Sequence, residues 1–186
     1  MAQKTKKLSS NYEESQLKNE FVKNSKSDIE NDLNSKDLKK QALHEKNFED
    51  FGFKESILKS LEKKGYVNPT PIQLAAIPEL MQGRDLLGQA QTGTGKTAAF
   101  ALPIIDKLEN NNEIKAKVLV MTPTRELATQ VADSFKSYSS KSKDLKTIAI
   151  YGGTDFRNQI SSLKRKTDIV VGTPGRIMDH IRQGTF

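Results

Sequence analysis

A lysine and a threonine end a glycine-rich stretch near the middle of the chain, Ala90-Gln91-Thr92-Gly93-Thr94-Gly95-Lys96-Thr97. Glycines at this spacing let successive backbone N–H groups turn inward around an anion, and a following helix adds its N-terminal amides. The Lys96 ammonium can contact β- and γ-phosphates, and the Thr97 hydroxyl can ligate Mg²⁺. Ala90 stands where the strict motif has glycine. The pattern predicts a phosphate-binding loop for a nucleoside triphosphate; the alternative is a Gly/Thr turn that caps an ordinary helix.

A second polar element precedes this loop, in Gly65-Tyr66-Val67-Asn68-Pro69-Thr70-Pro71-Ile72-Gln73. Thr70 is a good N-cap and Pro71 suits the first helical position, so a helix should start here with Gln73 in its first turn. The Gln73 amide can donate and accept at once, which suits the amino and ring-nitrogen edge of adenine. Tyr66 offers a flat apolar face for stacking. Taken alone, the segment could also be a capped helix and nothing more.

Three further clusters follow apolar runs in the second half of the chain. The clusters are Pro123-Thr124-Arg125, Gly152-Gly153 and Thr173-Pro174-Gly175-Arg176. Ligands of open α/β sheets bind outside the carboxyl ends of strands, so all three should lie on the same edge as the phosphate-binding loop. Each cluster offers backbone N–H groups, a hydroxyl or a guanidinium, which suit phosphate. Individually each is an ordinary strand-to-helix turn; together they predict a phosphate-contacting surface.

The elements that must position these residues alternate between apolar runs and helical patterns. This alternation is typical of a parallel sheet covered by helices. We therefore predict an α/β P-loop fold, a parallel sheet with helices on both faces. The expected strands are 85–88, 118–121 (of the buried type), 147–150 and 168–171. Expected helices run through 57–64, from 71, through 97–102, 127–135 and 159–163, and to about 183.

Composition bounds the remaining possibilities. The 186 residues suffice for one domain, and the lack of cysteine excludes disulfides and thiolate metal sites. No apolar run approaches the roughly 20 residues that span a bilayer, and the N-terminus has no apolar core of a secretory signal. We expect a cytoplasmic protein without membrane contact. The net charge of +7 is compatible with a polyanionic partner.

Residues 1–46 differ from the rest in being rich in lysine, serine and asparagine and poor in apolar residues. We expect a disordered, solvated tail here, because burial is too small to offset the ordering entropy. Leu33, Leu38 and Ala42 could mark one transient amphipathic helix. A loose lysine-rich arm that contacts RNA is the alternative. The folded domain should then span 47–186.

Together these motifs resemble those of DEAD-box RNA helicases. The segment 65–73 resembles the family's Q motif, with Phe48 as its upstream aromatic, and 123–128 resembles motif Ia. Gly152-Gly153 is similar to the GG element and 173–176 to motif Ib. The resemblance covers residue 48 to the end and is nearest to the bacterial cold-shock, ribosome-assembly branch. It implies a RecA-like fold, ATP and Mg²⁺ as ligands, adenine packed by Phe48 and Tyr66, and RNA bound through its backbone, with ribosomal precursors among its partners.

One family motif, Asp-Glu-Ala-Asp, is expected in a strand beyond Phe186, as are the Ser-Ala-Thr element and a second RecA-like domain. We therefore expect no catalytic residue in 1–186, which reads as the N-terminal part of an ATP-dependent RNA helicase. Such a fragment should bind ATP weakly, fail to hydrolyse it and fold poorly. The alternatives are a nucleotide- and RNA-binding module without turnover, and another P-loop class such as a DNA helicase, against which the Q motif argues. The oligomeric state stays open.

Overall fold

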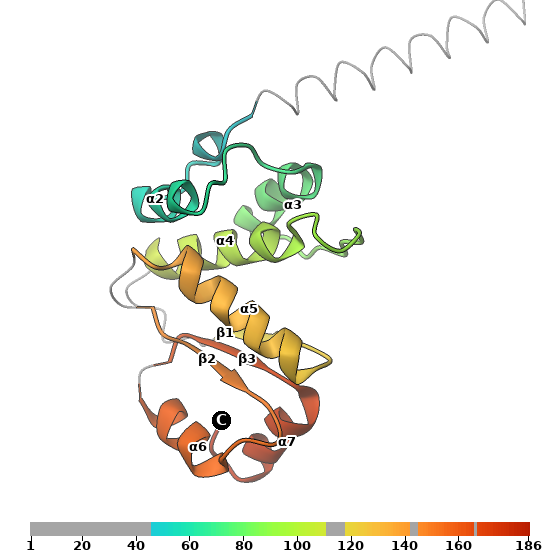
Figure 1. The fold of residues 1–186 in the computed structure, drawn as a ribbon, viewed down its shortest axis with the longest axis vertical. Helices are drawn as coiled ribbons and strands as arrows, with labels where there is room; N and C mark the ends of the chain where they lie inside the picture. The colour runs from blue at the N-terminus through green and yellow to red at the C-terminus, as the bar shows by residue number, and fades with distance from the viewer. Residues whose placement is uncertain (1–45, 111–117, 142–144, 166) are drawn as a thin grey trace, which may run out of the picture. The chain divides into compact units, whose positions relative to one another are not determined.

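The sheet of this protein consists of three parallel strands, β1 (Val118–Met121), β2 (Thr147–Ile150) and β3 (Ile169–Gly172), in the order β1-β3-β2 (Figure 1). The register aligns all three, since Met121 and Ile150 both pair with Gly172. The loops that follow the strands therefore leave the sheet at one edge. The strands predicted at 118–121 and 147–150 are confirmed, and the third lies one residue later than predicted.

The computed structural model describes residues 46–110, 118–141, 145–165 and 167–186. The predicted disordered tail, with its transient helix around Leu33, Leu38 and Ala42, lies outside the described residues except for Lys46. Lys46–Phe186 form one compact unit. The helices in the described ranges are η1 (Phe48–Phe51), α2 (Glu55–Lys63), α3 (Pro71–Met81), α4 (Lys96–Asn110), α5 (Arg125–Tyr138), α6 (Phe156–Lys164) and α7 (Pro174–Arg182).

Local sequence signals begin and end these helices. Pro71 and Pro174 occupy the first turns of α3 and α7, as proline's fixed φ allows. The Thr124 hydroxyl accepts from the Leu127 N–H at 3.2 Å and caps α5. Gly65, with φ of +72°, ends the turn after α2 as predicted. Of the helices in the described ranges, none combines the length and the apolar content that crossing a bilayer requires.

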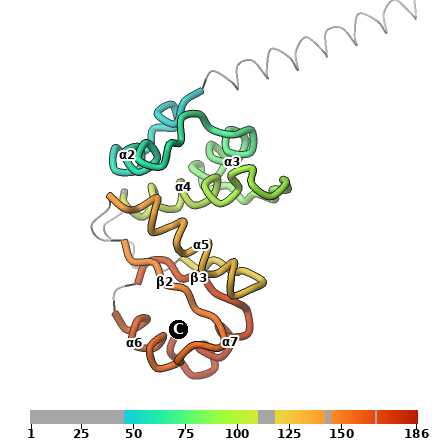
Figure 2. Tube along the Cα trace, viewed as in Figure 1, coloured from blue at the N-terminus to red at the C-terminus, as the bar shows by residue number. Residues whose placement is uncertain are grey.

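Alternating side chains of the strands face two helical layers. Ile169 and Val171 pack with Phe135 of α5, whereas Val170 packs with Ile177 of α7 on the opposite face. Figures 1 and 2 show α5 on one side of the strands and α6 and α7 on the other. The predicted parallel sheet with helices on both faces is confirmed.

The remaining helices attach to the sheet through α5. Helix α4 packs between α3 and α5 (Figure 1), and α2 contacts α4 and α5. Their shared core includes Ile57, Ile77, Leu102, Ile105 and Phe135, all with no exposed surface. The helix that follows the phosphate-binding loop is thus held mainly by other helices.

Two strand predictions need correction. Residues 85–88 form no strand, and the Leu87 side chain is fully exposed, because no described strand pairs with this segment. Strand β1 is buried on one face only: Val118 and Val120 pack into the core, but Leu119 and Met121 are 41% and 49% exposed. Strand β1 lies at the edge of the described sheet, and those two side chains are only partly covered by the described ranges.

Candidate functional site

The predicted phosphate-binding loop, residues 90–97, wraps around the start of α4. Gly93 and Gly95 have φ of +78° and +87°, values that favour glycine. The Lys96 ammonium donates to the carbonyl oxygens of Ala90 and Gln91, and the Thr94 hydroxyl donates to the Gln91 carbonyl at 2.8 Å. The loop is therefore closed by its own side chains, with the lysine nitrogen placed at its centre.

Gln73, predicted to read adenine, and Thr70, predicted as the N-cap before it, both touch this loop directly. The Thr70 hydroxyl donates to the Thr94 carbonyl at 2.8 Å, and the Gln73 amide nitrogen donates to the Gly95 carbonyl at 3.2 Å. The Gln73 amide oxygen accepts from the Thr70 N–H at 2.9 Å, and the whole residue is buried. A Cβ on Gly95 would overlap the Gln73 amide. The start of α3 and the phosphate-binding loop thus form one hydrogen-bonded unit.

The two predicted stacking aromatics lie against each other. The Phe48 and Tyr66 ring centroids are 6.2 Å apart in an edge-on arrangement, and Phe48 is 4% exposed. The Tyr66 hydroxyl lies 3.0 Å from the Tyr138 hydroxyl on α5. Burial, followed by this hydrogen bond, raises the pKa of Tyr138 above its ordinary value, so the phenol stays protonated. A cavity of about 590 Å³ borders Phe48, Gly65 and Tyr66.

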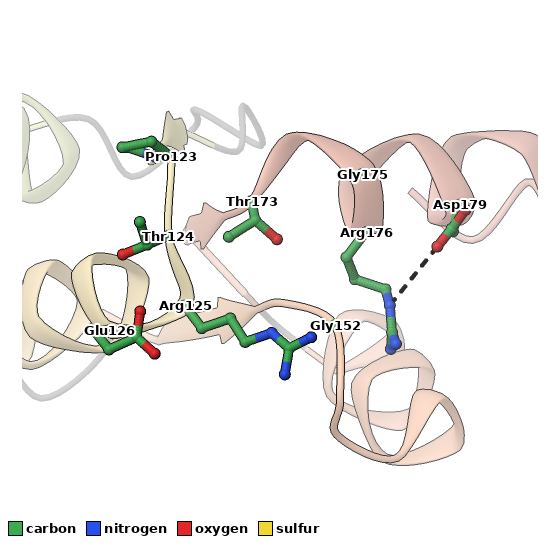
Figure 3. A pocket seen from close by; sticks show the side chains of 9 residues that line it. All are labelled: Pro123, Thr124, Arg125, Glu126, Gly152, Thr173, Gly175, Arg176 and Asp179. Carbon is green, nitrogen blue, oxygen red and sulfur yellow. Dashed lines mark ion pairs between the residues drawn. The ribbon is translucent and has the colours of Figure 1, made fainter.

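All three phosphate-contacting clusters predicted from the sequence meet in one groove of about 600 Å³, which we name the strand-end groove (Figure 3). Its lining comprises Pro123, Thr124, Arg125, Glu126, Gly152, Thr173, Gly175, Arg176 and Asp179. Helices α5 and α7 both begin at this groove. The positive ends of these two helix dipoles therefore lie at the groove.

The Arg125 side chain reaches from the start of α5 to Gly152 and Gly153 in the loop after β2. Figure 3 shows its side chain extending toward Gly152, and a Cβ on Gly153 would overlap its guanidinium. Gly153 has φ of +88°. The next residue in α5 is Glu126. A hydrogen bond from its own backbone N–H, and to a smaller extent one from the Thr124 hydroxyl, holds the pKa of the Glu126 carboxyl below its ordinary value. The donors at this helix start therefore favour negative charge.

Arg176 is the more tightly held of the two groove arginines. Its Nη1 donates to the Thr154 carbonyl and to the Gln159 amide oxygen, both at 3.3 Å, and its side chain is 15% exposed. Its Nε lies 3.8 Å from the Asp179 carboxylate, the pair marked in Figure 3. The guanidinium carbon lies 5.2 Å from the centre of the Phe156 ring.

Several residues that support Arg176 carry no signal in the sequence. Gln159 is predicted only as part of a helix through 159–163, and Phe156, Asp179 and His180 have no predicted role. His180 is buried, and burial followed by the charge of Arg176 lowers its pKa below the ordinary value of 6.5, while Asp179 acts in the opposite direction. No motif marks these positions; Gln159 and Phe156 on α6 contact Arg176 and His180 on α7, and Asp179 contacts Arg176 within α7.

A magnesium site made of protein groups alone is not present in the described ranges, where no cluster of three or more metal-binding side chains occurs. Thr97, the predicted ligand, lies in the first turn of α4 beside Lys96. A hydroxyl oxygen suits Mg²⁺, which usually takes its other ligands from phosphate and water. The residues present therefore fit a metal that arrives with a nucleotide.

Comparisons with known proteins agree on one family. The DEAD/DEAH box helicase model matches residues 70–186. DEAD-box ATP-dependent RNA helicase RhpA of Helicobacter pylori (strain B128) is 49% identical over 141 residues, which cover 76% of this chain and 28% of the relative. ATP-dependent RNA helicase DeaD of Escherichia coli (strain K12) is 48% identical over 146 residues, covering 78% and 23%.

Solved structures agree as well. A DEAD box protein from the hyperthermophile Methanococcus jannaschii superposes with a TM-score of 0.69 at 43% identity, over 75% of this chain and 38% of that one. An ATP-dependent RNA helicase from Sulfolobus tokodaii, described as hypothetical, gives a TM-score of 0.64 at 38% identity over 72% and 38%. The chain spans about a quarter of the length of the curated relatives it matches.

Proposed function

Because the chain belongs to the DEAD/DEAH box helicase family, we propose that it is part of an ATP-dependent RNA helicase. In this proposal residues 47–186 are the ATP-binding portion and part of the RNA-binding portion of a longer protein. That protein couples ATP binding and hydrolysis to the local opening of an RNA duplex. A nucleotide- and RNA-binding segment without turnover is the second candidate, since it would use the same residues that are predicted to contact phosphate.

The observation that carries the proposal is the strand-end groove. It assembles two guanidinium groups, Arg125 and Arg176, with the N-terminal ends of two helices. These groups suit phosphate oxygens spaced along a nucleic-acid backbone. Backbone contacts carry no base information, so little sequence preference is expected. RNA is the polyanion that the family resemblance implies, with 2′-hydroxyls as additional contacts.

ATP binding would use the phosphate-binding loop. The Lys96 ammonium would exchange the carbonyl oxygens of Ala90 and Gln91 for β- and γ-phosphate oxygens, which offer a stronger charge-assisted contact. The Thr97 hydroxyl would hold Mg²⁺, which neutralises phosphate charge when bound. We further propose that Phe48 and Tyr66 pack about the adenine and that Gln73 reads its edge, although in this structure its amide bonds Thr70 and Gly95.

The RNA proposal is tested by replacing each groove arginine in turn. Arg125→Ala and Arg176→Ala should each weaken binding to all single-stranded sequences alike. Each should also lower the salt slope by about 0.7 for every phosphate that the variant no longer neutralises. Arg182→Ala, at the exposed far end of α7, is the matched control. A change in base preference with an unaltered salt slope would contradict backbone binding.

Two finer assignments follow from the same resemblance. We propose that ribosomal precursors are among the RNA partners and that the protein acts in the cytoplasm. Ultraviolet crosslinking of the whole protein in its own cells tests the first, since enrichment of precursor ribosomal RNA over messenger RNA is expected. Fractionation of the same cells tests the second, and recovery with the membranes would contradict it.

A further inference from the structure

The side-chain amide of Gln159 on α6 lies at the centre of a buried hydrogen-bond network behind the strand-end groove. Gln159 is 7% exposed. Its nitrogen donates to the Tyr151 carbonyl at 3.0 Å and to the Thr154 hydroxyl at 2.5 Å. Its oxygen lies 3.3 Å from Nη1 of Arg176 and 3.0 Å from Nε2 of His180. All four hydrogen-bonding positions of the amide are therefore used.

The two loop contacts fix which way this amide faces. Both N–H groups of Gln159 are taken by acceptors of the loop after β2, so its oxygen must face Arg176 and His180. An amide oxygen only accepts, so His180 donates through a protonated Nε2. The amide is thus held from one side and presents one oxygen to two donors on α7.

His180 is itself held in place by contacts on its other sides. Its ring stacks on Phe156, with centroids 4.2 Å apart and planes 17° apart, and the residue has no exposed surface. Its Nδ1 lies 2.8 Å from the Thr185 hydroxyl. The ring cannot turn away from Gln159 without losing the stack and both hydrogen bonds.

We propose that Gln159 and His180 are positioning residues that hold the Arg176 guanidinium ready for an RNA phosphate in the strand-end groove. The inference rests on the proposed RNA contact of Arg176. A free arginine side chain has a large rotamer entropy, and fixing the side chain before binding reduces the entropy that is lost when RNA binds. The neutral Gln159 oxygen holds Nη1 without adding negative charge to that of Asp179, whose carboxylate lies 3.8 Å from Nε.

The test combines single and double substitutions in the full chain. Binding of a short fluorescein-labelled oligouridylate is measured by anisotropy at low salt, with circular dichroism to verify folding. Arg176→Ala should weaken binding about tenfold, within the range of a charge-assisted contact. Gln159→Leu should weaken it about threefold or more, and the double variant should bind as weakly as Arg176→Ala alone, since Gln159 acts through Arg176. Gln82→Leu, exposed after α3, is the control.

The outcomes separate this inference from the function on which it rests. Unchanged binding by Arg176→Ala would remove both. Weakened binding by Arg176→Ala with parental binding by Gln159→Leu, or losses that multiply in the double variant, would overturn the inference alone. Should Gln159→Leu not fold, Gln159→Glu decides: its carboxylate should lower the salt slope by neutralising Arg176, and an unaltered slope would overturn the inference.

His180→Phe sharpens the result, because it keeps an aromatic ring on Phe156 and removes the donor to Gln159 together with the Nδ1 contact to Thr185. We expect about a twofold loss of RNA affinity, because the neutral hydrogen bond to Gln159 is lost and its effect reaches RNA only through Gln159 and Arg176. That loss should vanish in the Arg176→Ala background. A loss that persists there would show a general effect on folding and would overturn the role of His180.

Discussion

The phosphate-binding loop and the strand-end groove use the same materials, glycines and threonines at the starts of helices, but they are held in place differently. The groove lies where backbone hydrogen bonds of the sheet continue past the strand ends. The Thr122 N–H donates to the Gly172 carbonyl at 2.9 Å and the Thr173 N–H to the Ile150 carbonyl at 3.0 Å. The phosphate-binding loop follows a segment, 84–91, that pairs with no described strand. It is held by side chains of Thr70 and Gln73 instead.

The cationic side chains differ in the same way. Arg125 extends toward Gly152 and Arg176 is bonded to Thr154 and to Gln159 on another helix, whereas the Lys96 ammonium is bonded to carbonyl oxygens of its own loop. Sheet pairing spreads the support of the groove over many backbone bonds. The phosphate-binding loop depends on a few side-chain bonds, so it should be the more sensitive of the two to single substitutions.

The largest difference is expected between Gly95→Ala and Gly153→Ala. Both glycines have positive φ, which costs about 1–2 kcal/mol for alanine. At Gly95 the new methyl group also displaces the buried Gln73 amide, which costs about 1–3 kcal/mol more, while at Gly153 it meets the movable end of Arg125. Urea denaturation should give a loss of about 3 kcal/mol for the first and about 1–2 kcal/mol for the second.

Gly83→Ala provides the control for that pair, since its φ is +77° and no atom lies near the added carbon. It should show the backbone strain alone. Equal losses at Gly95 and Gly153 would contradict the idea that the two sites differ in rigidity.

Removal of the lysine ammonium should come next in size. Lys96→Ala should reduce ATP affinity by about tenfold to a hundredfold, because a hydrogen bond to a charged group is worth about 1.5–3 kcal/mol. RNA affinity at the strand-end groove should be unaffected. Equilibrium titration with a fluorescent ATP analogue checks this, with Lys107→Ala on the exposed face of α4 as the control. Unchanged affinity for Lys96→Ala would remove the loop from nucleotide binding.

Gln73→Ala should abolish most of the discrimination between ATP and GTP. The substitution also removes the Gln73 hydrogen bonds to the Thr70 N–H and the Gly95 carbonyl, so the free energy of unfolding should fall by about 1–2 kcal/mol. Competition titrations of the two nucleotides measure the first effect and thermal denaturation the second. Retained preference for adenine together with lost stability would assign Gln73 to loop support alone.

The smallest effect concerns pH and the groove side of the comparison. The pKa of His180 lies below 6.5 in the folded protein, so the unfolded chain binds this proton more readily. The contribution of neutral His180 to the free energy of unfolding is therefore complete above about pH 6.5. It declines as the pH falls from there toward the pKa of His180 in the folded protein. Melting temperatures at about pH 7.5 and about pH 5.5 should differ more in the parent than in His180→Phe. An identical pH dependence would contradict the assigned shift.

Much of this architecture could be predicted because the signals are local. Thr70 with Pro71, Thr173 with Pro174, and Gly65 fix helix ends through bonds to residues a few positions away. Apolar runs identified β1, β2 and β3 to within one residue. Parallel strands share one edge, so the meeting of the three clusters in the strand-end groove followed from topology alone.

Only the tertiary structure decided which side chains have neighbours. The run at 85–88 is as apolar as a strand requires, but pairing depends on a partner strand, and none of the described strands provides one. Leu119 and Met121 are exposed for the same kind of reason, since burial depends on what covers a face. The bonds from Gln73 to Gly95 and from Gln159 to Arg176 join residues that are distant in the chain. Local propensity determines elements, whereas pairing, burial and amide orientation are set by contacts that no local pattern encodes.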